Sequence, residues 1–186
     1  MEDHELVALY WSRNEAAIEE TGRKYGPYLY KVAYNILADR EDAEESVNDT
    51  YLKTWNAIPE ARPTVLSTFL ARITRQTAID KWRRRRSQKR GGGEYQAALD
   101  ELEDCVAGGE TPEDTVDRKE LAEAIDRFLY AESGEARDIF LARYFYADPI
   151  KEIARATGYG EGKIKSMLFR MRKRLKEYLE KEGFGE

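Results

Sequence analysis

The sequence predicts an all-α protein of two small helical domains joined by a flexible acidic linker. Apolar residues recur at spacings of three and four along nearly every patterned segment, which is the periodicity of amphipathic helices. No segment keeps the alternation of a strand with turn residues at both ends. Charge is also divided along the chain, because residues 1–61, 62–90, 91–136 and 137–186 carry net charges of −7, +9, −11 and +4. These blocks indicate two basic surfaces suited to a polyanion, with an acidic segment between them.

The first domain is expected over residues 1–90. Its first helices run from about Glu5 to Leu37, with an interruption at Gly26 and Pro27. Their inward residues are expected to be Leu6, Leu9, Tyr10, Ile18, Tyr25, Leu29, Val32 and Ile36. Asp39 is a good N-cap for the next helix, which carries its apolar stripe on Val47, Tyr51, Trp55 and Ile58. The opposite, polar face of that helix includes Glu45, Asn48, Asp49 and Lys53.

A proline-bounded loop and a basic helix complete this domain. Residues 59–65 are expected to form a short rigid loop, since proline fixes φ. The helix that resumes near Leu66 places Phe69, Leu70, Ile73 and Thr77 on one side and is strongly positive elsewhere, with Arg72, Arg75 and Arg83 to Arg86. This helix interleaves Arg72, Arg75 and Gln76 with Phe69, Thr74 and Trp82. Aromatic residues beside cations favour a surface that holds phosphates and unstacked bases. A solvated helix end is the alternative for the arginine run. Trp82 itself is expected to belong to the core rather than to contact a base, because its spacing from Ala78 and Ile79 continues the apolar side.

The segment from 91 to 112 is predicted to be the linker. It is acidic, has few apolar residues, and contains Gly91 to Gly93, Gly108 and Gly109. The second domain is expected over 113–186. Its first helices place Val116, Leu121, Ile125, Phe128 and Leu129 at helical spacing, and a further helix covers 136–146.

Residues 137–176 contain the spacing of a helix-turn-helix. Asp148 as N-cap and Pro149 as the first helical residue open one short helix, and Gly158 is suited to the left-handed residue that ends it. A second helix is expected after Gly160, following a three-residue turn. Ala154 is small enough to let the two helices cross closely.

The second of these helices has the composition of a DNA-recognition helix. Ile164, Met167, Leu168, Met171, Leu175 and Leu179 are its inward residues. The outward face carries Lys163, Lys165, Ser166, Phe169, Arg170, Lys173 and Arg174. Lysine and arginine bind phosphates or guanine edges, serine bonds to either, and Phe169 fits a thymine methyl. The alternative is an amphipathic helix whose basic face is merely solvated.

Three stretches resemble extracytoplasmic-function (ECF, group 4) sigma factors of the sigma-70 family of bacterial RNA polymerase. They are DREDAEESVNDTYLKTWNAI (residues 39–58), FLARITRQTAIDKWRRRR (69–86) and IKEIARATGYGEGKIKSMLFRMRKRL (150–175). The first two are similar to region 2 and the third to region 4, so the resemblance covers nearly the whole chain. It departs from the family at Gln76, where many relatives have Asn, and at Gly160, where serine or proline often opens the helix.

The resemblance implies a role for each basic or polar face. The polar face with Glu45, Asn48, Asp49 and Lys53 would bind the clamp helices of the largest polymerase subunit. The loop with Arg62, and the helix with Arg72, Arg75, Gln76, Asp80, Arg83 and Arg84, would bind the minus-10 element and the non-template single strand. The second domain would read duplex DNA at the minus-35 element and contact the polymerase flap. An anti-sigma factor is a further partner that the family implies.

Other functional classes find less support in the sequence. A free-standing helix-turn-helix repressor or activator is the principal alternative, and it would usually be a symmetric dimer. An enzyme is not expected, because the only histidine is His4 and no phosphate-binding glycine motif follows a strand. One cysteine, Cys105, excludes an internal disulfide, and no cofactor or metal is expected. Without a leader or an apolar span, we expect a cytoplasmic protein with no membrane insertion.

Overall fold

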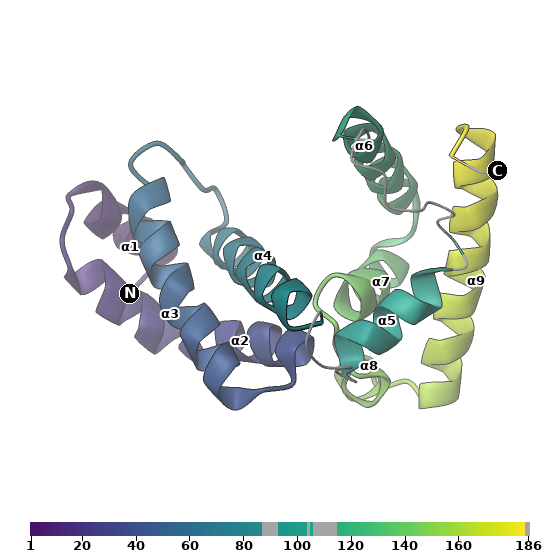
Figure 1. Ribbon diagram of the computed structural model, residues 1–186, viewed down its shortest axis with the longest axis horizontal. Helices are drawn as coiled ribbons and strands as arrows, with labels where there is room; N and C mark the ends of the chain where they lie inside the picture. The colour runs from purple at the N-terminus through teal and green to yellow at the C-terminus, as the bar shows by residue number, and fades with distance from the viewer. Residues whose placement is uncertain (87–92, 104, 106–114, 185–186) are drawn as a thin grey trace. The chain divides into compact units, whose positions relative to one another are not determined.

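The computed structural model describes residues 1–86, 93–103, 105 and 115–184. Throughout these ranges the regular secondary structure is α-helical, so the prediction of an all-α fold is confirmed. The chain divides into two compact units, residues 1–94 and residues 95–186 (Figure 1).

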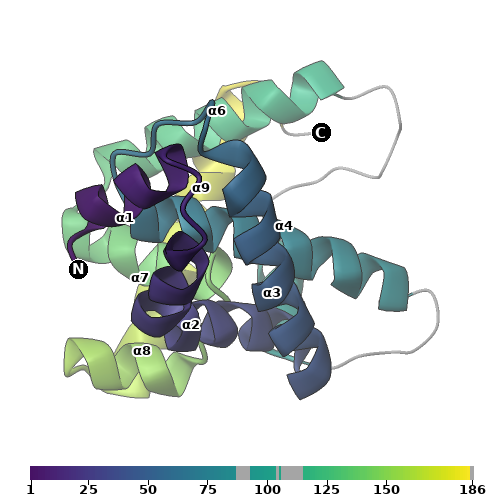
Figure 2. The same cartoon turned by 90° about the vertical axis from the view of Figure 1, so that its left-hand side faces the viewer.

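The described residues of the first unit form the helices α1 (Asp3–Trp11), α2 (Ala16–Leu37), α3 (Arg40–Ala57) and α4 (Leu66–Arg86). Helix α2 packs against α1, α3 and α4, and α3 packs against α4 (Figure 2). The side chains that are almost completely buried in this core include Leu6, Tyr10, Leu29, Ile36, Ile58, Leu66 and Leu70. As predicted, Asp39 is the N-cap of α3, where its carboxylate accepts a hydrogen bond of 3.0 Å from the Asp42 amide.

The predicted interruption at Gly26 and Pro27 is wrong, because α2 runs through both residues without a break. Apolar side chains on both sides of Pro27 are buried in one core, and this packing outweighs the backbone hydrogen bond that proline cannot make. Gly26 has a packing role instead, since a Cβ there would lie 3.3 Å from the Tyr51 hydroxyl. The chain breaks earlier, at the turn before α2, where Arg13 has a positive φ of 54°.

Helices α3 and α4 meet partly through hydroxyl groups. Thr50 and Thr74 are both completely buried, and their hydroxyl oxygens lie 3.0 Å apart. The Thr74 hydroxyl also bonds to the Leu70 carbonyl of its own helix. The expectation that Thr74 belongs to a nucleic-acid surface is therefore wrong, because its methyl and hydroxyl groups are both used in packing.

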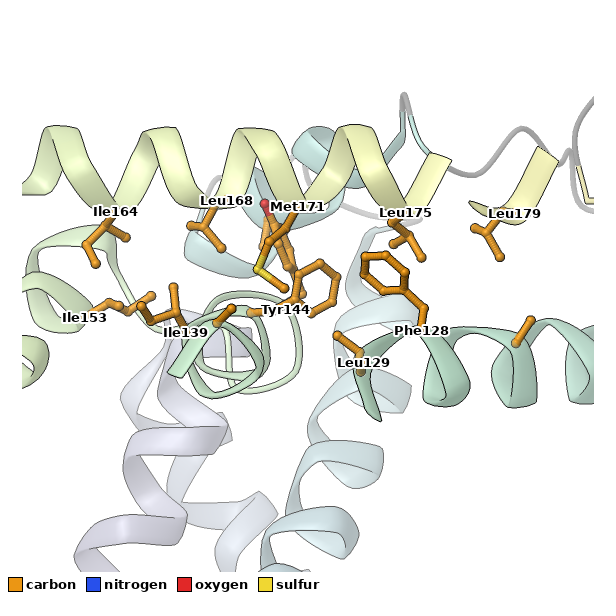
Figure 3. Packing of buried hydrophobic residues seen from close by; sticks show 14 of the residues in the cluster. Phe128, Leu129, Ile139, Tyr144, Ile153, Ile164, Leu168, Met171, Leu175 and Leu179 are labelled. Atoms are coloured by element: carbon orange, nitrogen blue, oxygen red, sulfur yellow. The ribbon is translucent and has the colours of Figure 1, made fainter. Parts of the chain in front are cut away.

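The second unit consists of α5 (Glu94–Glu103), α6 (Thr115–Ala131), α7 (Gly134–Tyr144), α8 (Ile150–Thr157) and α9 (Glu161–Lys181). Helix α9 contacts α6, α7 and α8 and carries one side of their shared core. Figure 3 shows its apolar row facing side chains of the other helices, with Ile164 toward Ile153 and Leu175 toward Phe128. Helical spacing predicted this row correctly, because its residues lie on one face of a regular helix.

Helix α5 lies within the segment assigned to the linker from sequence. Tyr95 and Ala98 are buried, and Leu102 is partly buried against the core of the second unit. Three apolar residues at spacings of three and four are enough to anchor a ten-residue helix, although the segment around them is acidic. Residues 104 and 106–112 of the expected linker lie outside the described residues, as do Gly91 and Gly92.

Candidate nucleic-acid interface

The turn between α8 and α9 has the geometry that the sequence predicted. Gly158 ends α8 in the left-handed conformation, with a φ of 75°, and its amide donates to the Ala154 carbonyl at 3.0 Å. Residues 158–160 then form the turn, and Gly160 is the N-cap of α9. The start of α8 differs by one residue from the prediction. Pro149, rather than Asp148, is the N-cap, because its ψ of 143° is extended and its carbonyl accepts the first helical hydrogen bonds.

Helix α9 separates its buried and exposed residues almost completely. Its five core side chains are at most 1% exposed, and they are Ile164, Leu168, Met171, Leu175 and Leu179. The opposite face holds the six residues predicted to contact the minus-35 element, which are all exposed, namely Lys163, Lys165, Ser166, Phe169, Arg170 and Lys173. Phe169 is an apolar side chain left 61% exposed in the middle of these cations. Such a face can bind phosphates and reach base edges in a major groove.

Two cations near this face are held by other residues of the protein. The Lys163 ammonium lies 3.1 Å from the ring centroid of Tyr159, and the Tyr159 hydroxyl bonds to Glu135 of α7. Arg174, which the sequence placed on the outward face, makes two hydrogen bonds of 3.0 and 2.8 Å to Glu132. Arg174 is exposed, as the sequence predicted, but the helical pattern could not show this acidic partner 42 positions earlier. Within the described part of the chain, Lys165, Arg170 and Lys173 make no ion pair.

A buried ionic network lies behind α9, and the sequence did not indicate it. Arg143 is 3% exposed and binds Glu101 of α5 through two hydrogen bonds, of 2.7 and 3.2 Å. The Tyr144 hydroxyl donates to the same carboxylate and accepts a hydrogen bond from Arg172 of α9. Burial alone would raise the pKa of Glu101, but the hydrogen bonds and charge of Arg143, with help from Tyr144 and Arg172, hold that pKa below its ordinary value. The network fixes α5, α7 and α9 to one another.

Helix α4 carries the residues predicted to contact the minus-10 element. Arg72 and Gln76 are exposed, while Arg75 and Asp80 are half-buried. The Gln76 amide donates a hydrogen bond of 2.9 Å to Asp80, so these two side chains orient each other on the surface. Arg75 and Gln76 are neighbours in sequence and point to different sides of the helix.

The arginine run at the end of α4 is used in two ways. Arg83 and Arg84 are exposed. Arg85 instead pairs with both Asp39 and Asp42 at the start of α3. The hydrogen bond from the Asp42 amide, followed by the charge of Arg85, lowers the pKa of the Asp39 carboxyl. The side chain of Arg86 lies outside the described residues.

The polar face of α3 is partly tied to α4. Glu45 forms an ion pair of 2.6 Å with Lys81, and Lys53 donates to the Thr77 hydroxyl at 2.8 Å. Asn48 is exposed and Asp49 is half-buried. Leu52 lies on the same side of the helix and is 60% exposed. The sequence analysis did not include this apolar residue, because it identified the face by its polar side chains.

Arg62, in the loop between α3 and α4, lies against an aromatic side chain of α1. Its guanidinium is 5.6 Å from the ring centroid of Trp11. Trp11 is 50% exposed. It was not selected from the sequence, because it lies 51 positions before Arg62 in the chain.

The comparison with protein families concerns the first unit. Residues 23–88 match the family described as Sigma-70 region 2. The match lies within the first unit. The matched residues include all of α3 and α4 and most of α2, so the predicted minus-10 and polymerase-binding faces lie on the matched region.

The chain is also similar to curated RNA polymerase sigma factors, two of which are named as ECF sigma factors. The ECF RNA polymerase sigma factor SigE of Mycolicibacterium smegmatis is 23% identical over 165 residues, which cover 89% of this chain and 62% of the relative. RNA polymerase sigma factor SigV of Bacillus subtilis is 25% identical and covers 84% of this chain and 87% of the relative. ECF RNA polymerase sigma factor SigM of Mycobacterium tuberculosis is 26% identical, with coverages of 95% and 84%. These similarities support the prediction of an ECF sigma factor and do not favour the free-standing regulator.

Among solved structures, the chain is similar to one titled "Structure of CnrH in complex with the cytosolic domain of CnrY". The alignment covers 96% of this chain and 97% of that chain, with 20% identity and a TM-score of 0.43.

Among the described residues, no group of three or more His, Cys, Asp or Glu side chains is arranged to hold a metal ion. None of the helices described is both long enough and apolar enough to cross a bilayer.

Proposed function

We propose that this chain is a group 4 ECF sigma factor that directs core RNA polymerase to specific promoters and assists their opening. The observation that carries the proposal is that a sigma-70 region 2 match over residues 23–88 occurs in the same chain as a helix-turn-helix with an exposed cationic face. We assign residues 1–90 to core binding and minus-10 recognition and 113–186 to minus-35 recognition, with residues 91–112 as the connecting segment, whose helix α5 packs on the second unit.

The minus-35 element would be read by α9. Lys165, Arg170 and Lys173 are exposed and have no internal ion pair among the described residues, so their charges are available to phosphates or guanine edges. Ser166 and Phe169 lie among them and suit a base edge and a thymine methyl. Lys163 would first leave the ring of Tyr159, so its contact is expected to be with the phosphate backbone.

The minus-10 element would be opened on α4 and the loop before it. Unpairing and extruding a base costs a few kcal/mol, and binding of the single strand must offset this cost. Arg62, Arg72, Arg75, Arg83 and Arg84 supply cations for the strand's phosphates. Gln76 and Asp80 are already hydrogen-bonded to each other, and together they offer an amide and a carboxylate to one unpaired base.

Core polymerase would bind the exposed side of α3. Asn48 and Asp49, with Glu45 and Lys53 held in place by α4, form a polar surface for the clamp helices of the largest subunit. Leu52 adds an apolar centre to this surface, which suits a protein partner. The second domain would contact the flap of the polymerase. An anti-sigma factor would compete with the polymerase for the surfaces of the two domains. The protein would act in the cytoplasm, together with the polymerase.

Run-off transcription with purified core polymerase on a promoter library tests the proposal. Promoter-dependent transcripts are expected from the wild-type chain. Arg170→Ala and Lys165→Ala are each expected to reduce transcription about tenfold on promoters that need the minus-35 element, because each removes a cation from the reading face. Asn48→Ala combined with Asp49→Ala is expected to weaken core binding without changing promoter preference.

Lys181→Ala is the matched control for the recognition helix. Lys181 is an exposed lysine at the last position of α9, beyond the predicted contacts, and its removal should leave minus-35 dependence unchanged. Equal effects of all variants on core binding and on promoter preference would refute the division of labour. Tight, specific binding of the chain to duplex DNA without polymerase would refute the sigma-factor proposal itself.

A further inference from the structure

Trp11 is an aromatic side chain that the hydrophobic core leaves outside. It is the last residue of α1 and is 50% exposed, whereas its neighbour Tyr10 is completely buried and bonds to the Thr21 hydroxyl. An indole exposed to this degree loses apolar contact that the fold could have provided. Exposure alone does not indicate a ligand, because Tyr34 of the same unit is also 41% exposed, so the side chains around Trp11 must be considered.

The turn that follows Trp11 holds the end of α1 in place. Arg13 adopts a left-handed conformation there and donates a hydrogen bond of 2.6 Å to the Trp55 carbonyl near the end of α3. Its guanidinium also lies 4.2 Å from the centroid of the Trp55 ring. These contacts join the end of α1 to the end of α3, from which the loop with Arg62 departs.

The loop between α3 and α4 runs past the end of α1 (Figure 2). An amide-to-carbonyl hydrogen bond of 2.8 Å from Ala61 to Ala57 shapes its first turn, and Pro59 and Pro63 restrict its backbone. This geometry brings the Arg62 guanidinium to 5.6 Å from the Trp11 ring centroid. An exposed indole and an exposed guanidinium thus lie side by side on the surface.

This pair has the chemistry of a site for single-stranded nucleic acid. An indole ring stacks on a base of any sequence, and an adjacent arginine neutralises the phosphate. Of the charged residues in and next to the pair, Arg13 and Arg62 are cationic and Glu60 is acidic, so the balance favours an anionic ligand. A duplex offers no free base face to the indole, because its bases are stacked on one another.

We propose that Trp11 and Arg62 form a stacking site for an unpaired base of single-stranded DNA. The inference rests on the proposed function, which supplies an opened promoter, and it adds a residue of α1 to a strand-binding surface otherwise assigned to α4 and its preceding loop. The base stacks on the indole of Trp11 while Arg62 turns toward the phosphate.

The test uses the full chain with core polymerase and two fluorescently labelled DNA probes, a promoter duplex with a pre-unpaired minus-10 region and the same duplex fully paired. Trp11→Ala is expected to weaken binding to the unpaired probe about tenfold, and Trp11→Phe to restore most of it, since phenylalanine also stacks. Binding to the paired probe should not change. Tyr34→Ala is the matched control, because Tyr34 is an aromatic residue of the same unit with 41% exposure.

A second measurement does not depend on the stability of any variant. With 5-iodouracil placed at each unpaired non-template position in turn, ultraviolet irradiation of the wild-type complex should crosslink one position to Trp11. Equal binding of wild type and Trp11→Ala to the unpaired probe, with no crosslink, would overturn the inference. Loss of core binding instead of DNA binding would also overturn it, in favour of a protein contact at Trp11.

The wild-type chain separates this failure from failure of the proposed function. If it gives promoter-dependent transcripts while Trp11→Ala binds the unpaired probe normally, only the stacking site is lost. If it gives no such transcripts and does not prefer the unpaired probe, both proposals are lost.

Discussion

Helices α4 and α9 carry most of the predicted DNA contacts, and both are 21 residues long, yet they are packed in different ways. Helix α9 buries a row of large aliphatic side chains, and cations gather on the exposed face between Lys163 and Arg174. Helix α4 buries a mixture of leucines, alanines and the two threonines Thr74 and Thr77. Its sequence therefore shows a less distinct boundary between the buried and the exposed face.

The cations of the two helices are also used differently. In α4, Lys81 pairs with Glu45, and Arg85 pairs with Asp39 and Asp42 of α3. In α9, Arg172 and Arg174 are held by internal partners, while Lys165, Arg170 and Lys173 make no ion pair among the described residues. A count of lysines and arginines thus overstates the charge that either helix can offer to DNA. The acidic blocks of the sequence supply part of the neutralisation.

The largest effect is expected from the aliphatic row of α9. Leu168 is 1% exposed within the core of the second unit, so Leu168→Ala should lower the free energy of unfolding of that unit by about 3 kcal/mol. Urea titration followed by circular dichroism measures this loss. Lys165→Ala, on the exposed face of the same helix, is the control and should change stability by less than about 0.5 kcal/mol. A loss below about 1 kcal/mol for Leu168→Ala would contradict the packing difference between the helices.

The same contrast explains how far the sequence could predict this structure. The row of α9, the turn at Gly158 and the N-cap at Asp39 depend on residues close together in sequence, and local periodicity and capping rules found them. The buried position of Thr74 and the pairing of Arg174 depend on side chains far away in sequence, which no local pattern contains. Trp11 was missed for the same reason, since only folding brings Arg62 beside it. The continuous α2 shows that burial on both sides of a proline can override a local helix breaker.

A smaller effect is expected from the network that anchors α9 through Arg172. Glu101→Gln leaves Arg143 buried without a charged partner and should destabilise the second unit by about 2 kcal/mol, less than for a fully buried pair because Glu101 is 30% exposed. The lowered pKa of Glu101 also gives this contribution a pH dependence. It is fully present above the unfolded pKa of about 4.3 and is lost as the pH falls through the lower folded value.

Unfolding free energies of wild type and Glu101→Gln from pH 7 to pH 3 measure both effects. The difference between the two proteins should be largest at pH 7 and should shrink as the pH falls below about 4.3. Glu103→Gln is the control, because Glu103 is an exposed glutamate of the same helix. A difference that stays constant down to pH 3 would mean that the charge of Glu101 contributes nothing to the attachment of α5 and α9.

The smallest effect separates two arginines of α4 that the sequence makes equivalent. Arg83 is exposed without an ion pair among the described residues, whereas Arg85 is held by Asp39 and Asp42. If Arg83 binds a phosphate of the single strand, Arg83→Ala should reduce the slope of log binding constant against log salt concentration by about 0.7. Arg85→Ala should change that slope much less, because DNA would have to compete with two carboxylates for its charge. Titration of a partly unpaired promoter probe with the polymerase complex at several salt concentrations measures both slopes. If Arg83→Ala and Arg85→Ala change the slope equally, the ion pairs of α4 do not keep its cations from binding DNA.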